Sequence, residues 1–538
     1  MKNLVITRMV TVLLATALLL TTMMGGAFAQ AQQDATITFP LESPAEIRIA
    51  APDGMVASLA DNLPLWQEIE RLTNVKITWD VIAPVQYVEV MKLRIAAGTN
   101  QLADIMLLPN GLSMTDLGAQ GIIVPLETYI ERNGANIKAM YEAYPALKPL
   151  TSAGGHIYSI NALNESAYLA PYCFVIRKDW LDRLNLSAPE TIEDWMTVLT
   201  AFKDQDANGN GDPSDEIPFS AGGHAWYTTF WGNAWDLHLF QTGGYYPDEN
   251  GSMQFEFISE KAREFYTWLN QFYTDGLLDP EFMTLGSEDK MFEKVVLDQV
   301  GAFMCYPSNI PTLEAALIAN GVEDAYILPL VPPKGRYAQM TEIVGDLSVD
   351  GFVVTSNCDN PDLAVALMNF LYGSQQGEDL MNFGVEGWTY NKAADGTYSF
   401  TDIVTNDPNG LSASEVLEGF GCQLGLPYVK SSEREEVMMS GYSERQLADI
   451  LDVTDRTRPF AISGLILPPQ TEEETEAISG VGGDLMTYVW EMTGRFTIGS
   501  ESMDQWDTYV QTIKDMGIDE ILKVRQAQYD RLVAQPAQ

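Results

Sequence analysis

The stretch that decides the fold lies between residues 46 and 109 and contains three short apolar segments, "EIRIAAP" (46–52), "VKITWDVI" (75–82) and "DIMLLP" (104–109). The first two alternate apolar and polar residues, which is typical of a β-strand with one buried face. Stretches with helical spacing of apolar residues separate the three segments. Strands that alternate with helices indicate a parallel sheet of βαβ units, so we expect an α/β protein.

The length and the net charge of the chain exclude some classes of function. A chain of 538 residues with 46% hydrophobic residues is long enough for two globular domains. Its 31 Lys and Arg face 74 Asp and Glu, for a net charge of −43. This charge repels phosphate backbones and anionic lipid, so we expect no nucleic-acid or membrane-surface partner. Neutral ligands, cations and basic partners remain open.

The N-terminus has the features of a secretory signal peptide over residues 1–29. Lys2 and Arg8 precede an apolar run, and "AFA" ending at Ala29 has the small-x-small cleavage pattern. A transmembrane anchor is the alternative, but the apolar run is short. Residues 30–44 read as a polar linker. Because no Cys lies near the cleavage site, we expect a soluble exported protein without a lipid anchor, in a periplasm or outside the cell.

Cysteine and histidine usage gives little sign of a transition-metal site. The three His are widely spaced, and no Cys/His cluster has the spacing of a zinc site. Export permits disulfides, but the spacing of the Cys residues predicts no particular pairing. The four are Cys173, Cys305, Cys358 and Cys422.

The segment "DANGNGDPSDE" (206–216) has the composition of a cation-binding loop. Oxygen-bearing side chains recur at every second position, and Gly residues between them allow tight turns. Calcium takes six to eight oxygen ligands in a flexible shell. A register that starts at Asp204 is closer to the EF-hand loop, but we prefer one that starts at Asp206. A solvated turn is the alternative. The candidate calcium ligands are Asp206, Asn208, Asn210, Asp212, Asp215 and Glu216.

An aromatic-rich segment, "HAWYTTFWGNAWDLHLF" (224–240), follows the loop. Sugar sites stack aromatic rings on the apolar faces of the sugar, so Trp226, Trp231 and Trp235 are candidate ligand residues. Core packing is the alternative, since Trp231 and Trp235 are four residues apart and can share a buried helix face. Asn110 is a further candidate because it follows the end of a strand, where ligand loops of α/β proteins lie.

Three stretches together carry a family resemblance: "VIRKDWLDRLNLSAPETIEDWMTVLTAFKDQDANGNGDPSDEIPFS" (175–220), "YTDGLLDPEF" (273–282) and "GVEGWTY" (384–390). They resemble the extracellular solute-binding proteins of carbohydrate ABC importers, in the branch of alginate-binding proteins and LipO-type oligosaccharide binders. The resemblance implies two α/β lobes around a ligand cleft, which close by a hinge motion. It places residues 45–160 and 340–385 in the N-terminal lobe, and residues 161–339 and 386–538 in the other.

The resemblance also implies site residues. The family loop, D-P-N-G-N-G-K-x-D-E, holds a structural calcium ion, and Asp212 stands where that loop contributes a backbone carbonyl. One extra residue, at Pro213-Ser214, precedes the closing Asp215 and Glu216. The resemblance places Tyr306 and Trp388 at the cleft.

We therefore expect a monomeric substrate-binding protein that captures a carbohydrate, an oligosaccharide in particular, for the membrane permease of an ABC importer. The alternatives are a secreted glycan hydrolase and a peptide binder with the same fold. The sequence contains no G-x-S-x-G, H-E-x-x-H or P-loop motif, so we expect no enzymatic activity.

Overall fold

The computed structural model describes most of the chain after the predicted signal peptide. The described residues are 36–54, 56–109, 112–145, 147–153, 155–165, 172–223, 228–239, 242–335, 342–344, 347–408, 411–463, 465, 467–468, 470–478 and 480–534. The signal peptide lies outside this range, as do Trp226 and Asn110.

A six-stranded sheet forms the first lobe, with the strand order β17-β6-β14-β3-β1-β2. β14 runs antiparallel to both of its neighbours, and the other pairs are parallel. The three segments that open the chain are therefore parallel neighbours, as their pattern predicts. The strands are β1 (Ala45–Pro52), β2 (Val75–Ile82), β3 (Ile105–Leu107), β6 (Ser159–Asn164), β14 (Leu347–Val354) and β17 (Val429–Lys430).

Helices cover both faces of this sheet. Alternate residues of β1 point to opposite sides, so that Ile47 and Ile49 enter one apolar cluster and Ala50 enters another. The helices of this lobe are α2 (Pro64–Thr73), α3 (Pro84–Ala97), α4 (Met114–Ala119), α5 (Glu127–Asn133), α6 (Ala135–Ala143), α7 (Leu147–Thr151), α14 (Pro361–Gly373), α15 (Gln375–Phe383), α16 (Asp402–Thr405) and α17 (Ala413–Phe420). Its hairpins pair β4 (Ser152–Ala153) with β5 (His156–Ile157), and β15 (Tyr390–Lys392) with β16 (Tyr398–Phe400).

A four-stranded sheet forms the second lobe, with the order β12-β7-β11-β8. Phe174 and Ile176 of β7 pack into a large aromatic core, and Cys173 and Val175 pack into a smaller cluster on the other face. This sheet too is buried on both sides. Its strands are β7 (Cys173–Arg177), β8 (Ile217–Phe219), β11 (Val300–Cys305) and β12 (Ile327–Leu330), and a separate hairpin pairs β9 (Tyr245–Pro247) with β10 (Met253–Phe255).

The helices of the second lobe begin and end where local signals predict. Thr191 and Asp194 form a capping box at the start of α9, and Gly517 separates the last two helices at a positive φ of 93°. The helices of this part are α8 (Lys178–Arg183), α9 (Ile192–Asp204), α10 (Glu260–Thr274), α11 (Phe282–Leu285), α12 (Glu288–Val296), α13 (Ile310–Ala319), α19 (Glu444–Thr457), α20 (Glu472–Ala477), α21 (Leu485–Ile498), α22 (Trp506–Asp515) and α23 (Ile518–Ala534). α18 (Ser432–Met439) packs against β16 of the first lobe.

The lobe boundaries differ from those expected in two places. β6 continues to Asn164 within the first sheet, where Leu163 lies opposite Leu347, so the first lobe extends past residue 160. Residues 386–430 also pack in the first lobe and not in the second: Leu417 and Val429 belong to its core, and β17 pairs with β6. These pairings join segments far apart in the chain, which local patterns do not reveal.

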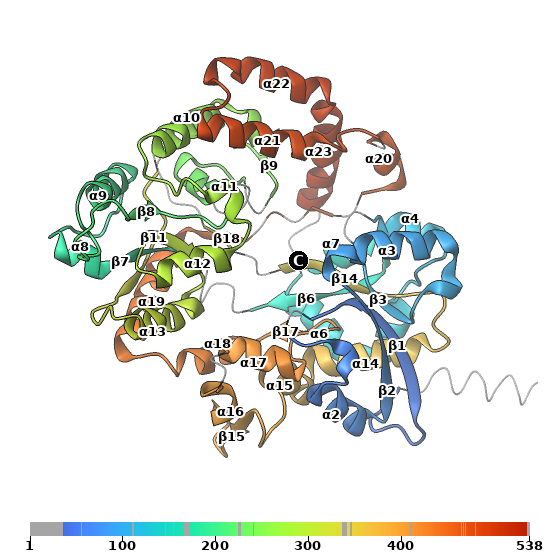
Figure 1. The fold of residues 1–538 in the computed structure, drawn as a ribbon. Coiled ribbons are helices and arrows are strands. Elements are labelled where there is room, and N and C mark those ends of the chain that lie inside the picture. The colour runs from blue at the N-terminus through green and yellow to red at the C-terminus, as the bar shows by residue number, and fades with distance from the viewer. Residues whose placement is uncertain are drawn as a thin grey trace, which may run out of the picture.

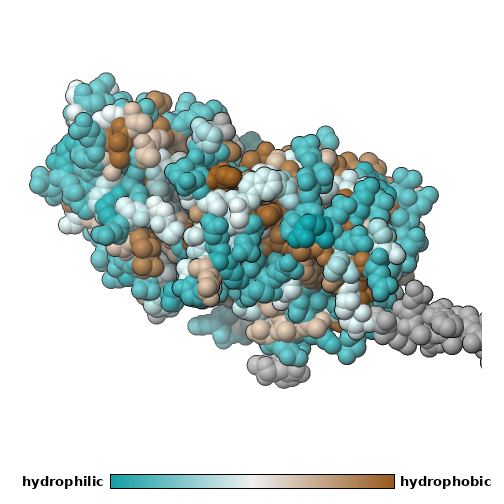
Figure 2. Space-filling model, turned by 90° about the horizontal axis from the view of Figure 1, so that it is seen from below, coloured by the Kyte–Doolittle hydropathy of each residue, from teal (hydrophilic) through white to brown (hydrophobic). Residues whose placement is uncertain are grey.

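Figure 1 shows the two lobes, one built from blue and gold-to-orange segments and the other from green and red segments. A short parallel ladder between β13 (Glu342–Val344) and β18 (Ala461–Ser463) accompanies the connections between them. Viewed from below, apolar side chains lie in small groups among hydrophilic ones (Figure 2). Within the described residues, no helix is both long and apolar enough to cross a membrane.

Candidate functional site

The candidate cation loop connects α9 to β8 at the edge of the second lobe. Gly209 and Gly211 have φ values of 76° and 93°, which is the left-handed region that favours glycine. These glycines let the chain turn after each oxygen-bearing residue. The loop therefore has the local backbone form that its alternating sequence predicts.

Short-range hydrogen bonds organise the first half of the loop. The backbone N–H of Asn210 donates to Asn208 Oδ1 at 2.9 Å, and that of Asp212 donates to Asn210 Oδ1 at 2.7 Å. The N–H of Gly211 donates to Asp206 Oδ2 at 3.0 Å. Such Asx-type turns hold the side-chain oxygens on the inner side of the turn.

Asp215 and Glu216, which close the loop, fold back onto it although one extra residue precedes them at Pro213-Ser214. The side-chain amides of Asn208 and Asn210 donate to the carboxylate of Asp215 at 3.1 and 2.8 Å. Glu216 Oε1 accepts from the backbone N–H of Ala207 at 2.9 Å. The insertion does not move Asp215 and Glu216 away from the other candidate ligands.

Two oxygens of the loop are buried without a hydrogen-bond partner: Asp206 Oδ1 and Glu216 Oε2. Burial raises the pKa of Glu216, and the nearby charge of Asp215 raises it further, while backbone N–H groups act in the opposite direction. Unsatisfied buried carboxylate oxygens are costly, and a hard cation would satisfy them. The residues present therefore fit a calcium ion.

The candidate calcium ligands include amide oxygens as well as carboxylates. In the described part of the chain, no three His, Cys, Asp or Glu side chains are grouped to hold a metal by themselves. Here the set depends on two Asn side chains and a backbone group as well. The carboxylate of Asp212 accepts from the N–H and hydroxyl of Ser214, which lowers its pKa.

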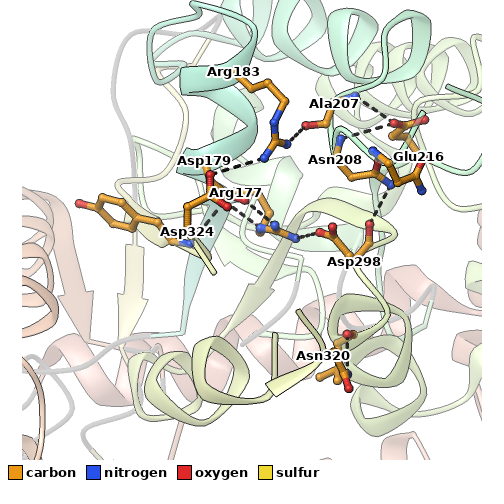
Figure 3. A network of polar contacts seen from close by, with 12 residues as sticks. Arg177, Asp179, Arg183, Ala207, Asn208, Glu216, Asp298, Asn320 and Asp324 are labelled. Carbon is orange, nitrogen blue, oxygen red and sulfur yellow. Dashed lines mark hydrogen bonds and ion pairs between the residues drawn. The ribbon is translucent and has the colours of Figure 1, made fainter. Parts of the chain in front are cut away.

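A polar network joins this loop to the "RKDWL" stretch (Figure 3). Arg177, whose side chain is fully buried, donates twice to Asp179, at 2.9 and 2.5 Å, and once to Asp298 at 2.5 Å. Burial by itself lowers the pKa of Arg177, but these two carboxylates outweigh it and raise the pKa overall. The backbone carbonyl of Asp298 accepts from Asn208 Nδ2 at 3.2 Å. The loop is therefore held to the sheet at β7 and just before β11.

The described aromatic residues that follow the cation loop are buried in the core of the second lobe. Trp231 and Trp235 lie in the 3-10 helix Thr229–Trp235 with exposed fractions of 0% and 1%. Trp231 packs edge-on against Trp195 at 5.2 Å between ring centroids, and Trp235 packs against Trp268 at 4.9 Å. Neither ring has a face available to a ligand. The prediction of ligand contact is wrong for both, because the whole 3-10 helix is buried in the aromatic core.

Tyr306 is exposed, as a ligand-stacking residue must be. It follows the end of β11 with 49% of its surface accessible, and its ring packs edge-on against Tyr172 at 4.9 Å. The Tyr172 hydroxyl donates to Glu288 Oε1 at 2.9 Å. Burial raises the pKa of Glu288. Tyr172 and Glu288 escaped the sequence interpretation, although an aromatic directly before a buried strand was a usable signal for Tyr172.

Trp388 lies in the first lobe and is 46% exposed. Its ring packs edge-on against Phe420 of α17 at 5.0 Å. Its role, like that of Tyr306, stays a prediction. Trp226 and Asn110 lie outside the described residues.

Two pockets lie in the described part of the first lobe. Neither is lined by Trp231, Trp235, Tyr306 or Trp388. One of about 1110 Å³ lies beside α5 and includes the ion pairs Arg132–Asp362 and His156–Glu127. Another of about 710 Å³ lies between α15, α18 and the β15–β16 hairpin, and its lining is rich in carboxylates.

Comparison with known proteins fits this architecture. A model of the family described as bacterial extracellular solute-binding protein matches residues 57–378, more than half of the chain. The chain belongs to this family.

A curated relative is the fructooligosaccharide ABC transporter substrate-binding protein FusA of Streptococcus pneumoniae. It is 24% identical over 543 residues, which cover 93% of this chain and 92% of FusA. Among solved structures, the alginate-binding protein AlgQ2, crystallised without calcium ion, aligns with a TM-score of 0.76 at 24% identity, over 92% of this chain and 100% of AlgQ2. An EF-hand mutant of FusA with fructo-nystose aligns with a TM-score of 0.72 at 21% identity, over 91% and 99% of the two chains. These structures share the two-lobe α/β fold.

Proposed function

We propose that this protein captures a carbohydrate outside the cell membrane and delivers it to the permease of an ABC importer, as a monomer without catalytic activity. The observation that carries the proposal is an exposed aromatic, Tyr306, at the end of a sheet strand in a member of the solute-binding family. Its ring packs at a steep angle against Tyr172, and about half of its surface stays accessible for stacking on a sugar. Relatives named for carbohydrate binding support the choice of ligand class.

The charges around Tyr306 favour a neutral glycan over a polyuronate. Glu288 lies directly behind the Tyr172–Tyr306 pair, and the chain carries a net charge of −43. A uronate carboxylate would be repelled there, while sugar hydroxyls can donate to a carboxylate. We therefore propose a neutral oligosaccharide as the ligand.

We further propose that the cation loop holds a structural calcium ion. Asp206, Asn208, Asn210, Asp215 and Glu216 would provide side-chain oxygens, and Asp212 its carbonyl. The two buried, unpartnered carboxylate oxygens support this, as does the fit of the donor set to a hard cation. When bound, the ion would offset part of the negative charge of the loop, which contains four carboxylates. Because the loop joins α9 to β8, its role is to brace the second lobe.

Export follows from the signal peptide proposed for residues 1–29, whose features are a basic start, an apolar run and "AFA". The absence of a Cys near that cleavage site supports release as a soluble protein into a periplasm or the extracellular space.

The test is a thermal-shift and calorimetric screen of the calcium-loaded protein. Its panel holds neutral fructo- and gluco-oligosaccharides, alginate and polygalacturonate oligomers, and peptides. A ligand that binds only the native state raises the melting temperature. We expect neutral oligosaccharides alone to do so, and Tyr306→Ala to weaken binding by about tenfold, since a stacked aromatic pair is worth about 0.5–1.5 kcal/mol beyond burial.

Ile318→Ala is the matched control, because Ile318 is 51% exposed in the same lobe but lies at the far end of α13. Shifts with peptides alone would reject the carbohydrate. Shifts with polyuronates alone would reject only the neutral class. Release of reducing ends from a glycan would identify a hydrolase.

A further inference from the structure

Cys173 and Cys305 lie directly opposite each other on neighbouring strands. β7 and β11 run antiparallel, and in their register Cys173 pairs with Cys305. Directly opposed residues of an antiparallel pair point to the same face of the sheet, with Cβ atoms about 4.5–5.5 Å apart. Both side chains enter the same apolar cluster between the sheet and α13.

The thiol of Cys173 also reaches the backbone of Cys305. Cys173 Sγ lies 3.7 Å from the carbonyl oxygen of Cys305, and the two residues are 4% and 0% exposed. Burial raises the pKa of the Cys305 thiol, and the neighbouring Cys173 raises it further. The structure contains no disulfide bond at either residue.

The other two cysteines have no such arrangement. Cys422 Sγ lies 3.7 Å from the carbonyl of Leu380, and Cys358 follows the end of β14. The pKa of each is raised to about 12 by burial first, and neither influences the other: Arg434 acts on Cys422, while Asp104 and Asp359 act on Cys358. Within the described residues, a single cysteine pair is placed for a covalent bond.

We propose that Cys173 and Cys305 form a cross-strand disulfide in the exported protein. The two thiols release two protons and two electrons as the S–S bond forms, and a disulfide-bearing oxidant, such as oxidised glutathione or an oxidised thiol oxidoreductase, is reduced to two thiols. An exported chain meets oxidants of this class. The disulfide cross-links the end of β11 to the start of β7.

The position of the bond gives it two consequences. It closes a span of 132 residues that contains the cation loop and the buried Trp231, so it restricts the unfolded chain strongly. It also lies next to Tyr172 and Tyr306, the residues that directly precede and follow the two cysteines. The covalent bond would hold these two rings at a fixed separation beside the proposed ligand.

The timing of oxidation follows from burial. A thiolate is the attacking species; burial raises the pKa of the Cys305 thiol and keeps both sulfurs away from solvent. The bond therefore forms while the chain folds, and the native reduced protein resists oxidation. Once formed, the disulfide is equally protected from reductants.

The experiment compares the full chain refolded with oxidised glutathione and refolded with a reductant. Thiols are counted in denaturant, and peptides are mapped by mass before and after reduction. We expect two titratable thiols in the oxidised protein and four in the reduced one. A peptide pair containing Cys173 and Cys305 should separate on reduction, and the melting temperature should fall by about 5 °C when the bond is absent.

Cys358→Ser is the matched control and should retain the linked peptide pair, leaving one titratable thiol. Cys305→Ser should abolish the linked pair, and if it fails to fold, the wild-type thiol count still decides. Four free thiols after refolding with oxidised glutathione would overturn the proposal, and so would a linkage that involves Cys358 or Cys422.

Discussion

Arg177 in the second lobe and Glu378 in the first are both charged side chains held partly or wholly away from water, but their neighbours differ in sign. Arg177 is fully buried between Asp179 and Asp298, and its hydrogen bonds to both measure 2.5 Å at their shortest. Each charge there has a partner of opposite sign. Such a network stabilises one arrangement of β7, the loop before β11 and the cation loop.

Glu378, on α15, has neighbours of its own sign. Burial raises the pKa of Glu378 to about 7, and the charges of Glu165, Asp379 and Glu433 add to the rise. Asp379 differs, because Lys392 pairs with it at 2.9 Å. Glu378, Asp379 and Glu433 line the 710 Å³ hollow in the first lobe.

The comparison separates two kinds of buried charge. A paired charge depends on its partners, so that the loss of one partner is expensive. A charge among like charges costs free energy whenever it is ionised, so its removal is favourable. The first kind should be sensitive to mutation, and the second should be sensitive to pH.

The largest effect is expected for Arg177→Met. This substitution leaves the buried carboxylate of Asp179 and the partly buried one of Asp298 without a counter-charge, which costs about 3–5 kcal/mol. The midpoint of urea unfolding, followed by tryptophan fluorescence, measures the loss. Because the network reaches Asn208, the cation loop should also lose calcium affinity.

Lys178→Met is the control for Arg177. Lys178 is the next residue, and its ion pair with Asp182 lies on the helix surface, so the cost should stay below about 0.5 kcal/mol. If Arg177→Met lowers the free energy of unfolding as little as Lys178→Met does, the stability of the protein does not depend on the ion pairs of Arg177.

The same contrast shows what the sequence could reveal. The strand pattern of residues 46–109 and the alternating oxygens of the cation loop are local signals, and both are present in the structure. Their geometry depends on residues within a few positions of one another. The sequence therefore predicted the α/β class and the form of the loop.

The failures involve contacts between distant segments. Four-residue spacing could not tell whether Trp231 faces the core or a ligand, since both arrangements use one helical face. Asp298 lies 121 residues from Arg177, and β17 reaches β6 across the chain, so neither contact was visible. The cluster around Glu378 likewise draws on residues from β6 to α18 and has no sequence signature.

The second prediction concerns Glu216. Its buried carboxylate lies beside the like charge of Asp215, and a bound cation would give both carboxylates a partner of opposite sign. Calcium at about 100 times its dissociation constant should stabilise the wild type by about 2.7 kcal/mol. Glu216→Gln should lose most of this gain, because it removes a charged ligand. Melting temperatures with calcium and with a chelator provide the measurement.

The pH dependence of the calcium effect follows from the raised pKa of Glu216. In the metal-free protein the raised pKa lets this carboxyl hold its proton to a pH above the ordinary glutamate value of 4.5, so protons compete with the ion there. The calcium-induced rise in melting temperature should therefore shrink as the pH falls towards that region. Asp204→Asn is the control: Asp204 is 60% exposed and lies outside the preferred register. A full loss of the calcium effect in Asp204→Asn would favour the register that starts there.

The smallest effect is expected for Glu378→Gln, and its sign is opposite to that of Arg177→Met. The folded pKa of about 7 lies above the unfolded value of 4.5, so the stability linked to this proton is fully present below 4.5 and is lost as the pH rises through 7. The wild type should weaken as the pH rises from about 4.5 to about 7 and should level off above that, whereas the variant should not show this change. Because Glu378 is partly exposed, solvent screening limits the gain at high pH to about 1 kcal/mol.

Urea midpoints across this pH range measure the difference between the two proteins. Glu436→Gln provides the control, since Glu436 is an exposed carboxyl that lines the same hollow and should leave the slope of stability against pH unchanged. If Glu378→Gln destabilises the protein at high pH, the carboxylate must have an unrecognised cationic partner, and the contrast with Arg177 would disappear.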